Sequence, residues 1–379
     1  VFGGVFPTFA PKLVLSFDAI DIVCKGEGED AITELCKRME QKKSFDDIGG
    51  LCIKKKNGEI VMNQPKLIDM DKNPLIDVSI FEEARYYKPM MGKIWRMFPI
   101  ETHRGCPYKC AYCNSPSQMS MHKLNQNESF LRRKTFENMR RELLFFKNEM
   151  KAEFLYFWAD TFFSWTRKDF ETFAELYQEI QLPFWCQTRP ETINEHRVKT
   201  LKKMGVARIA FGIEHGNEKF RAKYLDRKMS NKVITEGIKT VIRAEVPISV
   251  NNMIGFPHET RELAFDTIKL NKTFGSPEIV DNNSYPFTPF TGTPLRKLCE
   301  ELGYVKETDI VNSVMSQGSL LNMPQFSGEE VDGLTKTFNM YVSFPKSRWP
   351  EIKKAEGNSA ESERIYAGLK EEFTNNYLY

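Results

Sequence analysis

Short runs rich in β-branched and aromatic residues alternate with amphipathic stretches between residues 97 and 302, and this alternation constrains the fold more than any other feature of the chain. The spacing predicts strands at 98–102, 154–159, 184–187, 207–213, 248–254 and 279–285. A helix is predicted after each of the first five strands, at 130–150, 167–180, 194–204, 230–244 and 260–274. Repeated βα units build a parallel sheet, so we expect a partial (β/α)6, TIM-like barrel.

The segment before the barrel predicts a small α/β region. Residues 17–24 are typical of a buried strand and residues 31–39 of a helix, which together make one unit of a doubly wound domain. Residues 50–61 predict a β-hairpin that turns at Asn57-Gly58. Because the chain begins without methionine, inside a Gly-Gly turn, we expect it to be a piece of a longer protein.

Composition shifts divide the chain into four parts. We assign the remnant of an α/β domain to residues 1–64, a polar, proline-bearing linker to 65–96, the barrel to 97–302 and a mostly helical region to 303–379. In the last part we expect helices at 328–341 and 359–373.

Three of the eight cysteines lie within eight residues, in the run that contains Cys106, Cys110 and Cys113. The spacing C-x3-C-x2-C offers three thiolates from one short loop, so an iron–sulfur cluster there would keep one iron without a protein ligand. The loop follows the first predicted strand directly. It therefore belongs to the carboxyl-terminal face of the barrel, where the chemistry of such folds gathers.

A zinc site and a disulfide framework are the alternatives for these cysteines. Structural zinc normally takes its fourth ligand from a second Cys/His pair, which this chain lacks, although His103 or His122 would complete a Cys3His site. Disulfide frameworks are typical of short secreted chains, whereas 379 residues with 41% hydrophobic content can build an ordinary core. We favour the cluster and keep zinc open.

Polar side chains fall at the ends of the other predicted strands, on the same face as the cysteine loop. They are Asp160 after the second strand, Gln187 and Arg189 after the third, Glu214 and His215 after the fourth, and Asn251 on the fifth. Because the carboxyl ends of parallel strands share one edge of the barrel, we expect these side chains to surround the cysteines.

Charge and hydropathy exclude several classes of partner. The net charge of +3 is close to balanced, so no bulk field recruits nucleic acid or an anionic membrane, and we expect neither as a partner. No apolar stretch is long enough to cross a bilayer, and the first residues lack the charged region of a secretion signal. We expect a cytoplasmic protein, because a reducing compartment protects thiols and clusters.

The cysteine run reads Arg-Gly-Cys-Pro-Tyr-Lys-Cys-Ala-Tyr-Cys from Arg104 to Cys113. It resembles the RGCPxxCxxC motif of radical S-adenosylmethionine (SAM) enzymes, in particular the branch with an N-terminal cobalamin-binding domain. Further pieces of the resemblance, which covers roughly residues 1–305, are Gly-Glu-Gly-Glu at 26–29, Phe-Trp-Ala-Asp at 157–160, Gly-Ile-Glu-His-Gly at 212–216, Leu-Asp-Arg at 225–227, Ile-Gly-Phe-Pro-His-Glu-Thr at 254–260 and Pro-Phe-Thr-Gly-Thr-Pro at 289–294.

The resemblance implies that the three cysteines hold a 4Fe-4S cluster and that SAM is cleaved reductively to a 5′-deoxyadenosyl radical. It implies that Asp160 meets the methionyl ammonium, that Arg227 pairs with the methionyl carboxylate, and that the remaining SAM contacts are Tyr112 to the adenine and Gln187, Glu214 and Asn251 to the ribose hydroxyls. An ordinary surface ion pair is the alternative for Arg227 and Glu214. We expect His103, His215 and His258 to pack or hydrogen bond rather than to bind a metal.

Within the branch, the resemblance favours a cobalamin-dependent methyltransferase that acts on an unactivated carbon of a small molecule and takes electrons from a donor such as flavodoxin or ferredoxin. Where the family often has Gly-Gly-x-His-x-Thr, this chain has Gly-Gly-Val-Phe-Pro-Thr at 3–8, so cobalamin is expected in the longer parent protein rather than in this piece alone.

Other functions stay open from the sequence. They are a methylthiotransferase-like enzyme that modifies RNA, a zinc-bearing noncatalytic binding protein, and a noncatalytic barrel that keeps its cluster. Several aromatic and methionine side chains near the barrel mouth would line a substrate pocket or join the core, and we favour the core for Met119, Met121, Phe326, Phe338 and Met340.

Overall fold

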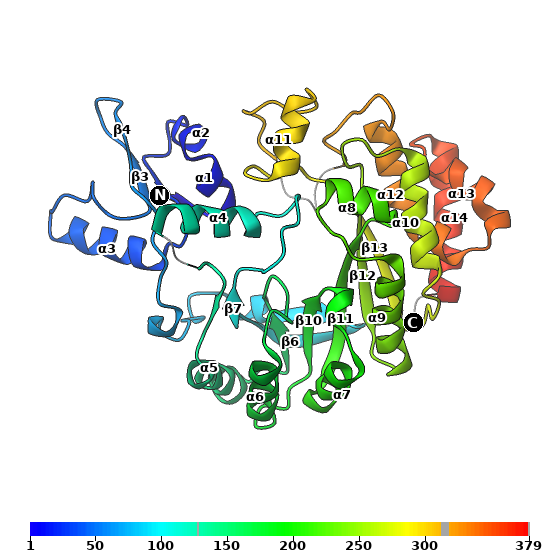
Figure 1. Ribbon diagram of the computed structural model, residues 1–379, viewed down its shortest axis with the longest axis horizontal. Helices are drawn as coiled ribbons and strands as arrows, with labels where there is room; N and C mark the ends of the chain where they lie inside the picture. The colour runs from blue at the N-terminus through cyan, green and yellow to red at the C-terminus, as the bar shows by residue number, and fades with distance from the viewer. Residues whose placement is uncertain (127–128, 312–317, 378–379) are drawn as a thin grey trace.

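The computed structural model describes residues 1–126, 129–311 and 318–377 (Figure 1). At its centre lies a curled sheet with the strand order β13-β12-β11-β10-β9-β6-β5. The strands are β5 (Tyr87–Met90), β6 (Lys93–Ile100), β9 (Phe154–Phe157), β10 (Phe184–Thr188), β11 (Val206–Glu214), β12 (Ile248–Ile254) and β13 (Val280–Pro286). All neighbours pair in parallel except β5 and β6, which form an antiparallel hairpin. The expected partial barrel of six parallel strands is confirmed.

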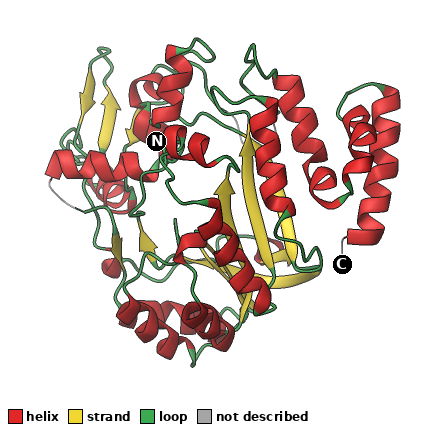
Figure 2. Ribbon diagram, turned by 45° about the vertical axis from the view of Figure 1, so that its right-hand side comes forward, coloured by secondary structure: helices red, strands yellow, loops and turns green. Residues whose placement is uncertain are grey.

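Amphipathic helices cover the outer face of this sheet and leave its concave face open (Figure 2). Each begins at a residue whose side-chain oxygen accepts a hydrogen bond from the backbone three positions later, which satisfies an amide that the helix itself leaves unpaired. These N-caps are Thr135, Thr166, Asn194, Ser230 and Thr260. The helices are α5 (Phe136–Asn148), α6 (Arg167–Tyr177), α7 (Glu195–Met204), α9 (Asn231–Arg243) and α10 (Arg261–Lys272).

The main core lies between the sheet and these helices. Phe157 of β9 is fully buried and its ring meets those of Phe173 and Phe184 edge to face, at 5.7 and 5.1 Å between centroids. Burying each such ring contributes roughly 1.5–3 kcal/mol, so the core holds the strand ends in fixed positions.

The first predicted helix is wrong at its start. Residues 130–135 are not helical, because Arg132–Arg133 form the short strand β8, which pairs with β7 (His103–Arg104) just before the cysteines. The helix begins only after this pairing, at Phe136.

The N-terminal region has its own sheet, with the order β1-β2-β3-β4. Its elements are β1 (Phe2–Gly3), α1 (Val5–Phe9), α2 (Pro11–Leu15), β2 (Ile22–Cys24), α3 (Glu29–Glu40), β3 (Leu51–Lys54) and β4 (Ile60–Met62). The predicted hairpin is β3 and β4. The predicted strand at 17–24 is wrong over its first half, where Phe17 is exposed and residues 17–19 form a turn.

Short helices and loops complete the molecule. The predicted linker contains the 3-10 turns Met70–Lys72 and Glu83–Tyr86, and its last residues form β5 and join the barrel sheet. Besides α1 and α2, helices that the sequence analysis did not expect are α4 (Ser115–Gln126), α8 (Glu218–Tyr224), α11 (Pro294–Glu301) and α13 (Trp349–Ala355).

The C-terminal helices lie at the opposite end of the molecule from the N-terminal region (Figure 1). The two predicted helices are present as α12 (Gly328–Ser343) and α14 (Ala360–Tyr377), and α12 packs against α10 and β13. Phe326, Phe338 and Met340 are buried in this second core, as expected. No helix among the described residues is long and apolar enough to span a membrane.

Candidate cluster and SAM site

The three cysteines lie on the loop between β7 and α4, at the carboxyl ends of the barrel strands. Cys110 is buried and Cys106 and Cys113 are half-buried, and none forms a disulfide. The loop is tight, since the amide of Cys113 donates to the carbonyl of Cys110 at 3.1 Å. Gly105, which precedes Cys106, has a φ of +89°, and a Cβ there would lie 2.9 Å from Leu131 Cα. Only glycine fits this approach.

Two buried arginines place positive charge beside the middle thiol. Arg189, at the end of β10, lies with Nη1 3.1 Å from Cys110 Sγ, and Arg227 Nη1 lies 3.6 Å from the same sulfur. Arg189 is 7% exposed and Arg227 3%, so little water screens them. Burial raises the pKa of Cys106 to about 12 and that of Cys113 to about 11.

These residues fit a 4Fe-4S cluster. Thiolates in a buried loop need compensating positive charge, which iron and the two guanidinium groups would supply. Three thiols from one loop, each free of a disulfide, form the donor set for such a cluster.

The arrangement does not support the zinc alternative. Among the described residues, no group of three or more His, Cys, Asp or Glu is placed to hold one metal ion. A cluster makes no such demand, because each of its cysteines binds a different iron. The imidazole of His103 is engaged elsewhere, with Nε2 3.0 Å from the Thr161 carbonyl and 2.8 Å from Ser164 Oγ, and His122 stacks on Phe130.

Arg227, Tyr112 and Glu214 form a buried constellation next to the cysteines. Arg227 Nη1 donates to the Tyr112 hydroxyl at 3.0 Å and lies 3.9 Å from Glu214 Oε1, while its Nη2 donates to the Gly212 carbonyl at 2.6 Å. The surface ion pair considered from the sequence is therefore wrong, because Glu214 is only 13% exposed and Arg227 3%. Burial raises the pKa of Glu214, and the nearby Arg227 opposes that shift.

The other predicted contact residues line the same strand ends. Asp160 is exposed and accepts a hydrogen bond from Ser115 Oγ at 2.7 Å, at the start of α4. Gln187 donates to the Ala159 carbonyl at 2.8 Å, and Asn251 lies 3.4 Å from the Asn283 amide. Each is thus held by a hydrogen bond to a neighbouring strand or loop.

Two contacts of the site escaped the sequence analysis. The sequence predicts Arg189 near the cysteines as a strand-end residue but not its particular contacts: its guanidinium lies 3.7 Å from the Tyr108 ring centroid and 2.5 Å from Glu191. Its position at a strand end was the available signal, since Cys110 is 79 residues away in the chain.

The second is Glu259, whose side chain is completely buried. One carboxylate oxygen lies 3.0 Å from His215 Nε2, and the other accepts the amides of Gly255 and Phe256 at 2.6 and 2.9 Å. This carboxylate fixes the turn after β12. His215 also stacks on Phe220, and the ring of His258 lies 5.1 Å from that of Tyr224, which agrees with the packing roles expected for both histidines.

A cavity of about 740 Å³ lies between the N-terminal sheet and this site. The barrel side contributes the indole of Trp158, the carboxylate of Asp160 and Gly105, which precedes the cysteines. The N-terminal side is built mainly of backbone and small side chains, including Gly3, Gly4, Gly26 and Gly28. A flat ligand could approach these glycines closely, because they present no side chain.

The chain matches a known family and several known proteins. Residues 100–270 match the family model described as the radical SAM superfamily. The chain is 24% identical to an uncharacterized methyltransferase of Pyrococcus horikoshii, over 91% of the chain and 72% of that protein. It is 23% identical to the hopanoid C-3 methylase of Methylococcus capsulatus, over 91% of the chain and 64% of that protein.

Two solved structures share the fold over 98% of the chain. The methyltransferase TsrM from Kitasatospora setae, with cobalamin and a [4Fe-4S] cluster bound, aligns over 81% of its length with a TM-score of 0.64 and 14% identity. OxsB, with aqua-cobalamin and SAM bound, aligns over 57% of its length with a TM-score of 0.62 and 14% identity. The cysteine motif, the open barrel and the family match agree that residues 100–270 form a radical SAM domain, and the chain is therefore an enzyme.

Proposed function

We propose that this chain carries the catalytic barrel of a cobalamin-dependent methyltransferase that acts on an unactivated carbon. The observation that carries the proposal is the shared cavity: Gly105, which precedes Cys106, and Asp160 border a space whose other wall is the glycine-rich edge of the N-terminal sheet. The methyltransferase names of two relatives and the cobalamin held by two proteins of similar fold support it.

The roles of the chain's own residues follow from charge and position. Cys106, Cys110 and Cys113 hold the cluster, and Arg189 and Arg227 offset negative charge on it. When bound, a 4Fe-4S cluster supplies single-electron reduction of SAM, and a corrinoid supplies methyl transfer. The chain's own side chains bind and orient SAM and the substrate.

SAM recognition uses opposite charges at the two ends of its methionyl group. In the proposal the exposed carboxylate of Asp160 pairs with the ammonium, and the guanidinium of Arg227 pairs with the carboxylate. Tyr112, held through its hydroxyl by Arg227, presents its ring to the adenine. Gln187, Glu214 and Asn251 offer acceptors and donors to the ribose hydroxyls.

The cavity is the proposed seat of the corrinoid. Trp158 is 62% exposed at its border, which leaves an aromatic face free to contact a planar ring.

A second cluster of the kind a methylthiotransferase would need is not supported. Cys24 and Cys52 lie on neighbouring strands of the N-terminal sheet, where both are buried, whereas Cys36 is exposed on α3. Burial raises the pKa of the Cys24 and Cys52 thiols, as for ordinary core residues.

We propose a small-molecule substrate, an electron donor of the flavodoxin or ferredoxin type, and a reducing compartment such as the cytoplasm. The single-electron chemistry requires the donor, and exposure of the cysteine loop to oxygen would favour irreversible thiol oxidation.

The decisive experiment is anaerobic. The chain is reconstituted with iron and sulfide, mixed with SAM and dithionite, and assayed for 5′-deoxyadenosine beside a variant that combines Cys106→Ala, Cys110→Ala and Cys113→Ala. We expect deoxyadenosine only from the unmodified chain. A brown, cluster-loaded chain that makes none would refute the proposed activity, and a colourless chain with stoichiometric zinc would refute the cluster itself.

A further inference from the structure

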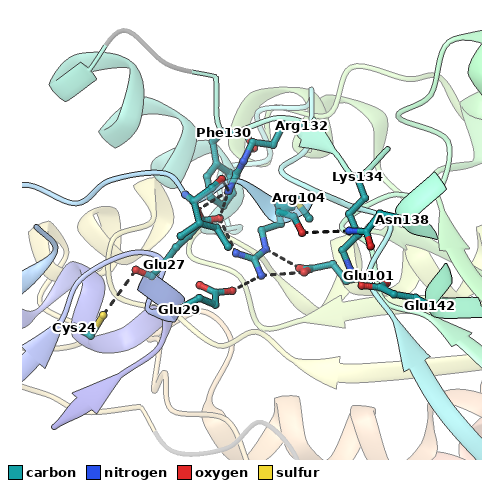
Figure 3. Close-up of polar contacts among 12 residues, drawn as sticks. Cys24, Glu27, Glu29, Glu101, Arg104, Phe130, Arg132, Lys134, Asn138 and Glu142 are labelled. Atoms are coloured by element: carbon teal, nitrogen blue, oxygen red, sulfur yellow. Dashed lines mark hydrogen bonds and ion pairs between the residues drawn. The ribbon is translucent and has the colours of Figure 1, made fainter. Parts of the chain in front are cut away.

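A network of ion pairs joins the N-terminal region to the cysteine loop, and Glu27 lies at its centre (Figure 3). Glu27 belongs to the turn between β2 and α3, and its side chain is only 5% exposed. One oxygen accepts from Arg104 Nη1 at 2.8 Å, and both oxygens lie 2.5 Å from Arg132 Nη2. The second oxygen also accepts the Ile68 amide at 2.8 Å.

The two arginines are tied to the cysteine loop by the backbone. Arg104 stands two residues before Cys106, and Arg132 is its direct partner across the β7–β8 ladder. Between Arg104 and Cys106 stands Gly105, pressed against Leu131. A shift of either guanidinium group therefore moves the backbone that enters the cluster loop.

Arg104 is bound by carboxylates of both the barrel and the N-terminal region. Its Nε and Nη2 donate to Glu101 of the barrel at 2.9 and 3.0 Å, while Nη2 also contacts Glu29, the first residue of α3, at 2.6 Å. Its side chain is 18% exposed. Ion pairs this buried hold their geometry much more firmly than pairs in water, and removal of one partner strands the others.

The same residues form a wall of the cavity. Glu27, Glu29, Glu101 and Arg104 all line it, next to Gly105. A ligand in the cavity therefore touches side chains that also hold the cysteine loop.

We propose that Glu27 is a positioning residue that fixes the cysteine loop to the cavity wall, and thereby couples occupancy of the cavity to the environment of the cluster. The coupling part rests on the proposed function. The positioning part concerns this chain's own contacts and is testable without a corrinoid.

The test compares Glu27→Gln with Glu356→Gln in the full chain. Glu356 is a matched control, because its side chain is 6% exposed and contacts Arg261, Lys353 and the Tyr341 hydroxyl, in the C-terminal helices. Two quantities are measured: hydrogen exchange of the amides at 103–113, and the electron paramagnetic resonance spectrum of the dithionite-reduced cluster with and without SAM.

We expect Glu27→Gln to speed exchange at 103–113 at least tenfold and to change the response of the spectrum to SAM, with both unchanged in Glu356→Gln. The proposal would be overturned if Glu27→Gln showed the same hydrogen exchange at 103–113 and the same spectra as the unmodified chain. If Glu27→Gln does not fold, Arg132→Lys, which keeps the charge and loses the fork, is judged by the same two measurements.

Titration with hydroxocobalamin tests the coupling. In the unmodified chain, loading of the cluster should change the Kd for hydroxocobalamin at least fivefold, which is the lower end of ordinary coupling between sites. In Glu27→Gln the same loading should change that Kd less than twofold. Equal changes in both would overturn the coupling. A chain that binds no hydroxocobalamin overturns the coupling, and a chain that makes no deoxyadenosine refutes the proposed function, whereas the loop exchange still decides the role of Glu27.

Discussion

The two ends of the barrel strands both carry arginines near carboxylates, but the surroundings of these arginines differ. At the amino-terminal end, Arg208 contacts Ser249 at 3.0 Å and Asp281 at 3.3 Å, beside a cavity of about 440 Å³ bordered by the β5–β6 turn and α14. At the carboxyl-terminal end, Arg227 faces Glu214 at 3.9 Å and directs itself at a cysteine. At the first end, the guanidinium of Arg208 is paired with polar groups of the neighbouring strands. At the second end, guanidinium groups lie beside the Cys110 thiol, which is a candidate ligand of the cluster.

This contrast teaches that polar residues inside a half-barrel are not evidence of chemistry by themselves. The carboxyl-terminal end differs in two ways. Buried positive charges lie beside a thiol there, and the backbone is strained at Glu214, whose φ is +69°. Four predictions test this difference between the two ends.

The largest effect is expected from removal of the cysteines. Replacement of all three by alanine should abolish cluster uptake and deoxyadenosine formation. Arg208→Met at the other end should leave both within about twofold, because its ion pair with the 45% exposed carboxylate of Asp281 lies far from the cysteines. Iron content and product yield are the measurements. Loss of product in Arg208→Met with an intact cluster would contradict the division between the two ends.

Arg227→Met should lower deoxyadenosine formation about 10- to 100-fold, because hydrogen bonds to charged groups contribute about 1.5–3 kcal/mol. Relative to Arg208→Met, the variant should have a lower kcat/KM for SAM but a similar thermal stability. Full activity with weakened folding would mean that Arg227 is only structural.

Arg189→Gln should lower the midpoint potential of the cluster, because a cation 3.1 Å from Cys110 Sγ favours the more negative, reduced form. We expect a shift of about 60 mV, which is a tenfold change for a one-electron couple. Redox titration followed by electron paramagnetic resonance measures it, with Arg208→Gln as the control. An unchanged potential would refute this role.

The smallest effect concerns pH. Burial raises the pKa of Glu214 above its ordinary value of 4.5, so the folded chain binds this proton more tightly than the unfolded chain. The resulting stability is fully present below pH 4.5 and is lost as pH rises through the folded pKa. Urea unfolding should show a slope of at most about 1.4 kcal/mol per pH unit from this group, and Glu214→Gln should remove it. A slope unchanged in the variant would show that other groups cause it.

The barrel could be predicted from the sequence because its strands are local and regular. The fifth strand was predicted with its observed bounds, Ile248–Ile254, and the helices after the second to fifth strands to within about three residues. The start of α5 was wrong because β8 forms only through pairing with β7, and β5 was missed because its exposed residues lack the alternation of a half-buried strand.

The site could be predicted less completely. The cysteine spacing is a local pattern, and the strand-end positions of Asp160, Gln187, Glu214 and Asn251 follow from the fold. The contacts of Arg189 with Cys110 and of Glu27 with Arg104 join residues 79 and 77 positions apart, and no pattern along the chain encodes them. Roles of these side chains toward SAM stay predictions, and so do the domain boundaries.

Both edges of the barrel sheet end in strands that carry proline. Pro89 lies in β5 and Pro286 ends β13, while α12 packs beside β13. A proline has no amide to offer to a further strand, so neither edge invites pairing with another copy of the chain. The sheet can therefore stay half closed without adding a strand from a neighbouring molecule along either edge.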